Sequence, residues 1–272
     1  LKDFSMLSEK IIEQAAIDHL EAEENSKPGL PLSIKHPEMT LEDAYAIQKS
    51  WVNKKIAQGQ KVVGYKIGYT SRAMQKALNI EEPDFGVLLD SMVYNDGAQI
   101  DVSKFCDPRI EVELAFVLKD RLEGENITIF DVLNATDYVV PTLEIIDART
   151  HRKDPETGYT RKVFDTVADN AGNAAIIIGG RPIKPLEMDL RWCGGILNIN
   201  GIVEETGLAA AVLNHPANGI CWVAKRFAPH GVALEPGQII LSGSFTAPVA
   251  VKAGDTVNAD YGTLGTISCH FV

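Results

Sequence analysis

The sequence predicts an α+β protein in which mixed, strongly curved sheets follow a helical segment. Helical periodicity is confined largely to the first 60 residues, and the rest consists mostly of short apolar runs separated by turn residues. The sequence has no Rossmann or P-loop glycine pattern, which argues against a doubly wound nucleotide-binding fold. With 272 residues, 45% of them hydrophobic, the chain can bury a substantial core. We therefore expect an N-terminal helical segment over residues 1–60 and a β-rich domain over residues 61–272.

Charge and cysteine usage exclude several classes of function. A formal net charge of −11 argues against binding to nucleic acid or to an anionic membrane surface. The four cysteines lie far apart and form no C-x-x-C pair, which is typical of reduced thiols. The sequence also lacks a run of about eighteen apolar residues and a signal-like start. We therefore expect a cytoplasmic protein without a membrane or nucleic-acid partner.

Two amphipathic helices are predicted in the N-terminal segment. Apolar residues recur at helical spacing from Ser8 to Glu24, and a proline- and glycine-containing stretch then ends the helix. Thr40 and Asp43 form an N-cap pattern that opens a second helix, which ends near Gly59. Both helices have apolar faces that must be buried against something else.

A lysine stands between two glycines in the first predicted strand, Val62–Tyr69. Lys66 shares a face with Gly64 and Gly68, and glycines at these positions leave room for a ligand to approach the amine. The alternative is a surface lysine that protects an edge strand from aggregation. A short helix should follow up to Leu78.

The next segment, Pro83-Asp84-Phe85-Gly86, is typical of a turn. In such a turn Asp84 is more often a turn-forming residue than a catalytic one.

Two later strands carry carboxylates in otherwise apolar surroundings. Side chains alternate along a strand over residues 108–118, so Glu111 and Glu113 share one face. Glu144 interrupts an apolar run over residues 138–146. An ionised carboxylate in such a place costs several kcal/mol unless a cation compensates it, and no basic residue stands beside these three. The alternative for Glu111 and Glu113 is the solvated face of an antiparallel strand.

These three carboxylates predict a metal site. Oxygen ligands suit a hard cation, Mg²⁺ or Mn²⁺, with about six positions to fill. Three glutamates leave about three positions for water or a chelating substrate, which is typical of a catalytic rather than a structural site.

A basic segment follows Glu144 in the sequence. Between residues 149 and 162 the chain carries five Arg or Lys residues and one His, although the protein is acidic overall. Long irregular loops of this kind are often functional. This segment is either a lid over the site or a solvated excursion.

The C-terminal half reads as strands with one helix. Ser244 lies in a turn, residues 243–246, that could present backbone N–H groups to an anion. Strands are predicted at 174–178, 196–203 (a hairpin with an Asn-Gly turn), 238–241, 249–251, 256–261 and 266–271, and a helix at 216–228.

Several motifs, in this order, resemble the hydratase/decarboxylase branch of the fumarylacetoacetate hydrolase superfamily. They are Gly64–Gly68, Pro83–Gly86, Ile110–Glu113, Glu144 and Val167–Ala171, and the resemblance extends from Thr40 to Val272. It implies a mixed β-roll like the C-terminal domain of that family, preceded by the helical segment. It also implies that residues 61–272 are catalytic, that Glu111, Glu113 and Glu144 bind the metal, and that Lys66 and Asp84 are catalytic.

Within this branch the chain resembles hydratases of seven-carbon 2-oxo-enedioates from meta-cleavage catabolism of aromatic compounds, in particular the homoprotocatechuate pathway. The features that carry this resemblance are Ile146–Arg149, Asp154–Thr157 and Arg161–Thr166. It implies a Mg²⁺- or Mn²⁺-dependent lyase that adds water to a 2-hydroxy-2,4-dienoate. It also implies a homo-oligomer, which we expect to be built from dimers.

A dioate substrate has a second carboxylate, and a bidentate arginine suits it better than a lysine. The candidates for this contact are Arg149, His151, Arg152 and Arg161. Gly172 stands where several relatives have a serine near the substrate, so only backbone contacts are expected there. Ser244 completes the candidate substrate-binding residues.

Other activities remain open at this point. The same enolate chemistry would serve a decarboxylase of 4-oxalocrotonate type or a 2-hydroxypentadienoate hydratase. C–C hydrolysis of an acylpyruvate usually requires a His-containing dyad, for which the sequence offers no matching pair. Outside enzymology, the carboxylates could hold a metal that only stabilises an oligomeric scaffold.

Overall fold

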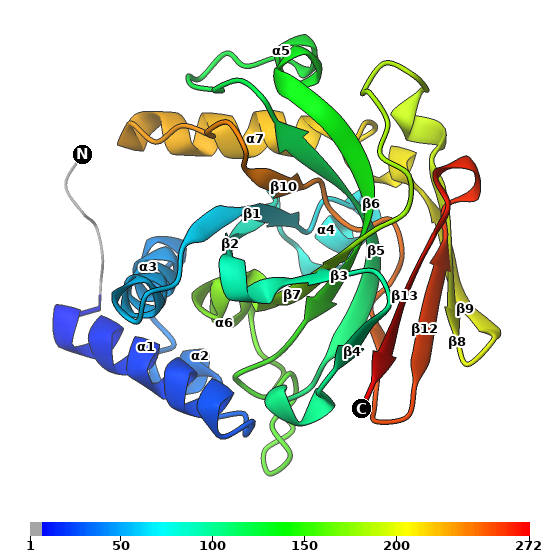
Figure 1. Ribbon diagram of the computed structural model, residues 1–272. Helices are drawn as coiled ribbons and strands as arrows, with labels where there is room; N and C mark the ends of the chain where they lie inside the picture. The colour runs from blue at the N-terminus through cyan, green and yellow to red at the C-terminus, as the bar shows by residue number, and fades with distance from the viewer. Residues whose placement is uncertain (1–6) are drawn as a thin grey trace.

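Two sheets form the framework of the protein, and the helices lie around the larger of them (Figure 1). The computed structural model describes residues 7–272, so the first six residues of the predicted helical segment lie outside it. The larger sheet has eight strands in the order β2-β1-β10-β5-β6-β7-β3, with β11 paired to β5. Its strands are β1 (Val62–Gly68), β2 (Asp84–Leu89), β3 (Val93–Asn95), β5 (Arg109–Leu118), β6 (Thr136–Ile146), β7 (Asn173–Ile178), β10 (Ile239–Leu241) and β11 (Val249–Ala250).

The smaller sheet has five strands in the order β4-β13-β12-β8-β9 and stands beside β5 and β6 in Figure 1. They are β4 (Ala98–Ile100), β8 (Gly194–Ile199), β9 (Ile202–Leu208), β12 (Thr256–Asp260) and β13 (Thr266–Phe271). The helices are α1 (Glu9–Glu24), α2 (Leu32–Lys35), α3 (Leu41–Ala57), α4 (Arg72–Leu78), α5 (Ile129–Ala135), α6 (Val163–Ala168) and α7 (Ala217–Phe227). Short 3-10 turns lie at Asp90–Met92, Val102–Lys104, Asn170–Gly172, Leu190–Trp192, Ala209–Ala211, Ala228–His230 and Gly262–Leu264. The predicted α+β class is confirmed.

Strand β5 separates the main core from the opposite face of the larger sheet. Its residues Ile110, Val112 and Leu114 are fully buried in one cluster with residues of the smaller sheet and of α7. Because side chains alternate along a strand, Glu111 and Glu113 point to the other face. The hydrophobic residues that line this other face form a small separate cluster that includes Ala115. The core packing of β5 therefore fixes the direction in which its carboxylates point.

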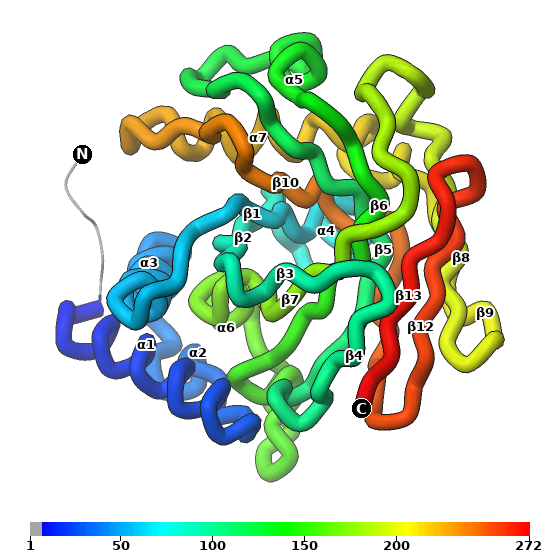
Figure 2. The backbone as a smooth tube through the Cα atoms, viewed as in Figure 1, coloured from blue at the N-terminus to red at the C-terminus, as the bar shows by residue number. Residues whose placement is uncertain are grey.

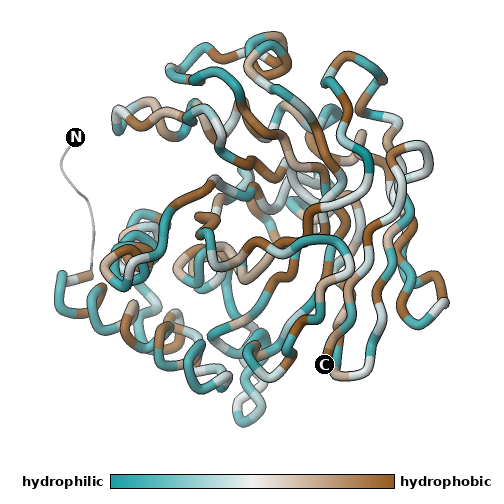
Figure 3. The backbone as a smooth tube through the Cα atoms, viewed as in Figure 1, coloured by the Kyte–Doolittle hydropathy of each residue, from teal (hydrophilic) through white to brown (hydrophobic). Residues whose placement is uncertain are grey.

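The N-terminal helices bury their apolar faces against the same chain. The predicted cap of α3 is confirmed, since Thr40 and Asp43 form a capping box, and Ser8 accepts a hydrogen bond from the backbone of α1. Trp51 of α3 is almost fully buried in a cluster that also contains residues of α1, β2 and α6. Figure 3 shows hydrophobic and hydrophilic residues interspersed along α1 and α3, as such packing requires. A second copy of the chain is therefore not needed to cover these faces.

The segment 83–86 was expected to be a turn, and this prediction was wrong. Asp84 begins strand β2, which pairs antiparallel with β1 so that Asp84 lies opposite Gly68 and Gly86 opposite Lys66. Turn-forming residues gave the misleading signal, whereas pairing with β1 satisfies the backbone hydrogen bonds of this segment. The short elements α2, α5, α6, β3 and β4 were not predicted either. The Asn200-Gly201 turn of the β8–β9 hairpin is confirmed, since both residues have a positive φ.

The basic segment, residues 149–162, is held to α2 and to the connection between α1 and α2. Gly29 donates a backbone hydrogen bond to Arg149 O, and His151 N donates to Gly29 O. The hydroxyls of Tyr159 and Ser33 lie 2.9 Å apart. Figure 2 shows this excursion beside α1 and α2. Among the described residues, no helix is long and apolar enough to cross a membrane.

Candidate active site

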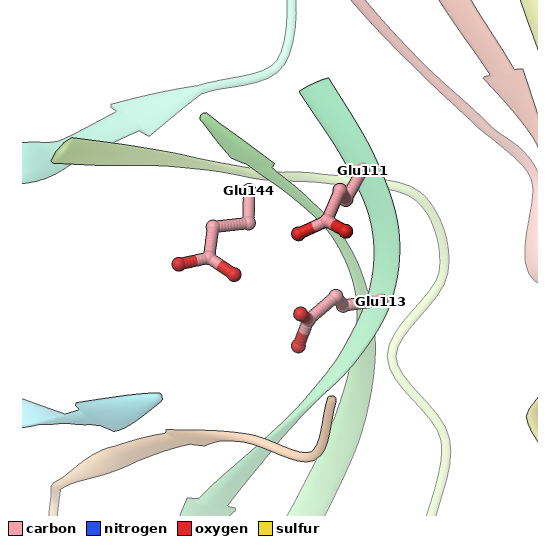
Figure 4. A group of neighbouring side chains, drawn as sticks. All are labelled: Glu111, Glu113 and Glu144. Carbon is pink, nitrogen blue, oxygen red and sulfur yellow. The ribbon is translucent and has the colours of Figure 1, made fainter. Parts of the chain in front are cut away.

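Pairing of β5 with β6 brings the three predicted glutamates together. Glu111 lies directly opposite Glu144 in the ladder, and Glu113 is two residues further along the same face. One carboxylate oxygen from each residue lies within 4.8 Å of the others. Figure 4 shows the three carboxylates directed into one space between the strands. Glu113 is 1% exposed, so the alternative of a solvated strand face is wrong for this residue, and Glu144 is 0% exposed.

The glutamate cluster is short of positive charge. Burial, followed by the repulsion of Glu144, raises the pKa of Glu111 to about 8. The same two causes, with Glu111 added, raise the pKa of Glu113 well above its usual range. Among the described residues, one ion pair reaches the cluster, with Lys66 Nζ 3.4 Å from Glu144 Oε1. Like charges directly opposite each other on paired strands destabilise a sheet, so this arrangement calls for a further cation.

The donor set fits a divalent metal. Neither carboxylate oxygen of Glu144 has a hydrogen-bond partner among the described residues, although both are buried. Glu113 has one partner, since Gly243 N donates to its Oε2 at 3.0 Å. Most of the oxygens are therefore free to act as ligands, and carboxylate oxygens suit Mg²⁺ or Mn²⁺. We expect these three residues to hold such an ion.

Lys66 and Asp84 lie next to this cluster, on β1 and β2. Lys66 is 4% exposed because β1 is covered by β2 on one side and β10 on the other, so it is not a surface lysine on an edge strand. A Cβ added at Gly68 would lie 2.2 Å from Asp84 Oδ1 and 3.3 Å from Lys66 Nζ. The two functional groups therefore share the space above Gly68. A side chain at this position would displace at least one of them.

The environment shifts the pKa values of these two groups in different ways. Burial lowers the pKa of Lys66, but the surrounding carboxylates, Glu144 and Asp84 first, outweigh it and raise the pKa above its ordinary value. Burial raises the pKa of Asp84 to about 6, although Lys66 acts in the opposite direction. The chain's own charges thus keep Lys66 protonated. A lysine base requires a lowered pKa, and these charges do not provide one.

Three residues beside the site hold a backbone conformation that non-glycine residues seldom adopt. Tyr69, Asn170 and Ala171 all have φ between 51° and 53°. Asn170 fixes β2 through its side chain, which accepts from Val87 N at 2.8 Å and donates to Val87 O at 3.0 Å. Strain of this kind costs about 1–3 kcal/mol per residue and clusters at functional sites. Spacing and residue type gave no signal for Tyr69 or Asn170 as parts of the site.

The structure also explains Gly172. This residue has φ +73°, and a Cβ there would lie 3.4 Å from Asp147 O. Its N–H donates to Asp169 O and its carbonyl accepts from Asp147 N, both at 2.8 Å. Both backbone groups are therefore used within the chain, which argues against the backbone contact to substrate expected at this position.

Ser244 is likewise occupied within the chain. Its Oγ donates to Thr246 O at 2.8 Å and to Val112 O at 3.3 Å. The turn does present a backbone N–H to an anion, but the anion is the carboxylate of Glu113, which receives the N–H of Gly243. In this arrangement the turn positions a glutamate of the cluster, and contact between Ser244 and the substrate stays a prediction.

The four basic candidates are not gathered around one point. Arg149 forms a buried ion pair with Asp169 at 2.8 Å and donates to Asn173 O. Arg152 forms an ion pair with Asp107, also at 2.8 Å. Arg161 reaches Asp169 at 3.3 Å, and His151 is held by its backbone N–H. The side chains of Arg149 and Arg152 are thus engaged in pairs within the chain.

Two cavities differ in their distance along the fold from the glutamates, Lys66 and Asp84: one includes Asp84 in its wall and the other does not. One of about 630 Å³ is lined by Asp84, Arg161, Lys162 and the segment from Ala77 to Pro83. The other, of about 740 Å³, lies on the smaller sheet, where Trp192 and Phe245 contribute to its walls. We place substrate entry at the smaller cavity, since Asp84 lies in its wall beside Lys66 and the glutamates.

Comparison with known proteins gives consistent relatives. The family model described as fumarylacetoacetate (FAA) hydrolase C-terminal matches residues 61–272. The chain is 58% identical to 2-oxo-hept-4-ene-1,7-dioate hydratase of Escherichia coli, over 93% of this chain and 94% of that protein. It is 39% identical to 2-keto-4-pentenoate hydratase of Paraburkholderia xenovorans, over 95% and 94%. The structure superposes with a TM-score of 0.93 on 4-oxalocrotonate decarboxylase from Pseudomonas putida G7, complexed with magnesium and adipate, at 36% identity over 98% and 100% of the two chains.

Proposed function

The chain belongs to the fumarylacetoacetate hydrolase C-terminal family, and from this premise we propose that it is a hydratase converting 2-oxo-hept-4-ene-1,7-dioate to 4-hydroxy-2-oxoheptanedioate. The observation that carries the proposal is 58% identity to the Escherichia coli hydratase over nearly the whole of both proteins. The site supports it independently, because the buried carboxylates of Glu111, Glu113 and Glu144 lie beside a lysine and an aspartate. This reaction would place the protein in the meta-cleavage catabolism of aromatic compounds.

The glutamates would hold Mg²⁺ or Mn²⁺, which when bound stabilises negative charge on the oxygens of a 2-oxo acid as a Lewis acid. The remaining chemistry requires proton transfer at defined atoms. In the 2-hydroxy-2,4-diene tautomer, C5 gains a proton while the 2-hydroxyl loses one, which gives a 2-oxo-3-ene. Water then adds its oxygen to C4 and a proton to C3.

Lys66 and Asp84 are the two groups placed to carry these protons. We assign proton delivery to the Lys66 ammonium, which lies 3.4 Å from Glu144 Oε1 and shares the space above Gly68 with Asp84. We assign orientation and deprotonation of the water to Asp84, whose pKa of about 6 leaves it mostly ionised at neutral pH. Gly68 and Gly86 let these two side chains pack closely against the backbone. A Cβ added at Gly86 would lie 3.3 Å from Lys66 Cγ and 2.4 Å from Asn170 O.

The direct test is an assay of the purified protein with Mg²⁺ and 2-hydroxyhepta-2,4-diene-1,7-dioate. Loss of the dienol absorbance and release of CO₂ are followed together. Hydration predicts loss of absorbance, a 4-hydroxy-2-oxo acid as product and no CO₂. The decarboxylase alternative, which the similarity to 4-oxalocrotonate decarboxylase favours, is tested with 2-oxohex-3-enedioate, whose distal carboxylate is conjugated through C3 and C4 with the 2-oxo group, and predicts CO₂ in proportion to that substrate consumed.

A non-catalytic role for the metal is separable from both activities. If the ion only stabilises an oligomeric scaffold, EDTA should dissociate the assembly, and no substrate should be consumed at any metal concentration. For an enzyme, EDTA should remove turnover, and adding Mg²⁺ should restore it.

We further propose that the protein is a homo-oligomer built from dimers and located in the cytoplasm. Support for self-association comes from large apolar side chains on and near the smaller sheet, among them Leu186 (77% exposed) and Trp192 (69% exposed). Support for the location comes from four free cysteines. A monomer by light scattering at micromolar concentration would contradict the first proposal. The division at residue 60 into helical segment and catalytic domain also stays a proposal.

A further inference from the structure

One arginine near the site is buried without full compensation of its charge. The side chain of Arg161 is 8% exposed, and among the described residues only its Nη1 makes hydrogen bonds. These are long contacts, 3.3 Å to Asp169 Oδ2 and 3.5 Å to Thr150 O. The Nε and Nη2 donors of this guanidinium have no partner among those residues. These two donors are not among the buried atoms that lack a partner, so they are open to a ligand, and covering them with a substrate would be costly unless it supplied an anion.

The neighbouring arginine shows why Asp169 is not sufficient. Arg149 donates to Asp169 Oδ1 through Nη1 at 2.8 Å and to Oδ2 through its backbone N–H at 2.9 Å. Two guanidinium groups thus share one carboxylate, and Arg149 holds the shorter contacts. The pKa values agree with this division. Asp169 and Glu23 outweigh burial and raise the pKa of Arg149, whereas burial lowers the pKa of Arg161.

Arg161 also lies where a second substrate carboxylate would be. It lines the same cavity of about 630 Å³ as Asp84. Asp84 shares the space above Gly68 with Lys66, and Lys66 contacts Glu144. These contacts connect the glutamates to Lys66 and Lys66 to Asp84, and the cavity wall that contains Asp84 also contains Arg161. A substrate with its 2-oxo acid end at the glutamates and its C4 and C5 beside Lys66 and Asp84 extends toward Arg161.

The other basic candidates are less suited to this role. Arg152 uses Nε and Nη2, the two nitrogens of its fork, on Asp107 at 2.8 and 3.1 Å. Arg149 is committed to Asp169 and to Asn173 O. Lys162 lines the cavity but is exposed and lacks a fork of donors. Arg161 combines free donors with a place in the cavity wall.

We propose that Arg161 binds the distal carboxylate of a dicarboxylic substrate through its Nε and Nη2 donors and thereby selects dioates over monoacids. This inference rests on the proposed function, since it takes the 2-oxo acid end of the substrate to lie at the glutamates. Bidentate recognition of a carboxylate is the task for which a guanidinium is better suited than an ammonium.

The test compares two substrates in the variants Arg161→Gln and Arg161→Lys. For 2-hydroxyhepta-2,4-diene-1,7-dioate, kcat/KM should fall about ten- to a hundred-fold, as expected for one charge-assisted contact. For 2-hydroxypenta-2,4-dienoate, which lacks the second carboxylate, kcat/KM should change little. Arg191→Gln is the matched control, because Arg191 is an exposed arginine paired with Asp189, and it should alter neither value.

Arg161→Lys guards against loss of folding, since it keeps a positive charge beside Asp169 but removes the fork. If either variant loses both activities equally while remaining folded, Arg161 is a general structural residue and the proposal is overturned. Unchanged activity toward both substrates overturns it as well.

A binding measurement separates this proposal from the proposed function. Heptanedioate and pentanoate are titrated into the metal-loaded protein by calorimetry. The wild type should prefer heptanedioate, and Arg161→Gln should lose that preference. If the wild type hydrates neither dienoate, the proposed function fails, but a preference for heptanedioate that depends on Arg161 would still support the selector. If heptanedioate binds equally to wild type and Arg161→Gln, the selector fails whatever the activity.

Discussion

Two buried clusters of charged side chains differ in how far the chain compensates them. The glutamate cluster combines Glu111, Glu113 and Glu144 with a single contacting cation, Lys66. The arginine cluster combines Arg149 and Arg161 with Asp169. In the first, both oxygens of Glu144 lack a hydrogen-bond partner among the described residues. In the second, both oxygens of Asp169 are hydrogen-bonded.

This difference in hydrogen bonding indicates which buried charges stabilise the fold and which are placed to bind a ligand. Around Asp169, donors of Arg149 satisfy both carboxylate oxygens. The Arg149 guanidinium, whose Nε has no hydrogen-bond partner among the described residues, lies 3.9 Å from Glu23 Oε2 and 5.1 Å from the Trp51 ring. Glu144 and the Nε and Nη2 donors of Arg161 lack hydrogen-bond partners among the described residues. Because an uncompensated buried charge destabilises the fold, its retention is best explained by binding of a metal at one end and of a carboxylate at the other.

The largest expected effect follows from breaking the satisfied cluster. Arg149→Met should lower the free energy of unfolding by about 3–5 kcal/mol. It leaves the buried Asp169 carboxylate with only the long contact to Arg161 and the hydrogen bond from the backbone N–H of residue 149. The measurement is urea unfolding followed by tryptophan fluorescence, to which Trp51, Trp192 and Trp222 contribute. Arg191→Met, which removes an exposed ion pair, is the control and should have no measurable effect. A loss no greater than that of the control would mean that the arginine cluster is not structural.

Breaking the unsatisfied cluster should instead affect catalysis. Glu113→Gln keeps the size of the side chain but removes one ligand charge, and kcat/KM should fall at least about a hundred-fold, the upper end of what the loss of an outer-shell metal partner costs. In metal-free buffer the variant should be no less stable than the wild type, since repulsion from Glu144 and Glu111 is relieved. Glu204→Gln on β9 is the exposed control. Full activity of Glu113→Gln in metal-free buffer would disprove the metal site.

Metal binding should increase the free energy of unfolding of the protein only when the glutamate cluster is intact. At a Mg²⁺ concentration one hundred times the Kd, the wild type should gain about 2.7 kcal/mol in the free energy of unfolding. Glu113→Gln should gain much less, because a ligand is missing, whereas Arg149→Met should gain as much as the wild type. Thermal or urea unfolding with and without Mg²⁺ measures this. Equal gains in the wild type and Glu113→Gln would place the ion elsewhere.

The glutamate cluster could be predicted from the sequence because strand geometry alone aligns Glu111 with Glu113. The apolar residues around them, and around Glu144, predicted that these carboxylates would be buried. The arginine cluster could not be predicted in this way. Arg149, Arg161 and Asp169 lie on irregular backbone, where no periodicity tells which way a side chain points. The sequence therefore predicted a basic loop near the site but not which arginine would be free.

Asp84 shows a second limit of the sequence. Its segment has turn-forming residues, and only the pairing of β2 with β1 places the carboxylate beside Lys66. Pairing between strands is a long-range property that local residue types do not encode. Resemblance to a family supplied the role of Asp84, whereas the residues alone favoured a turn. The close approach of Asn170 O to Gly86 was likewise outside what spacing can show.

The smallest expected effect is a dependence of stability on pH that has opposite signs for the two clusters. The pKa of Asp169 is lowered by its arginines, although burial acts against them, so its contribution to stability is present above its ordinary pKa and is lost as the pH falls. The pKa of Asp84 is raised to about 6 and that of Glu111 to about 8. Their contributions are present below their ordinary pKa values, near 4, and are lost as the pH rises through 6 and 8.

In EDTA, the free energy of unfolding should therefore fall between pH 4 and pH 8, with Asp84 accounting for about 1–3 kcal/mol of the change between pH 4 and pH 6. Urea unfolding at one-unit intervals measures it. Asp84→Asn should make the fall between pH 4 and pH 6 less steep, because an amide does not titrate, and should leave the part of the fall up to pH 8 that Glu111 and Glu113 cause. Saturating Mg²⁺ should reduce that later fall, since a bound cation compensates the ionised glutamates. Stability that rises steadily from pH 5 to pH 8 in EDTA would show that the chain compensates its own glutamates, and the contrast between the two clusters would be lost.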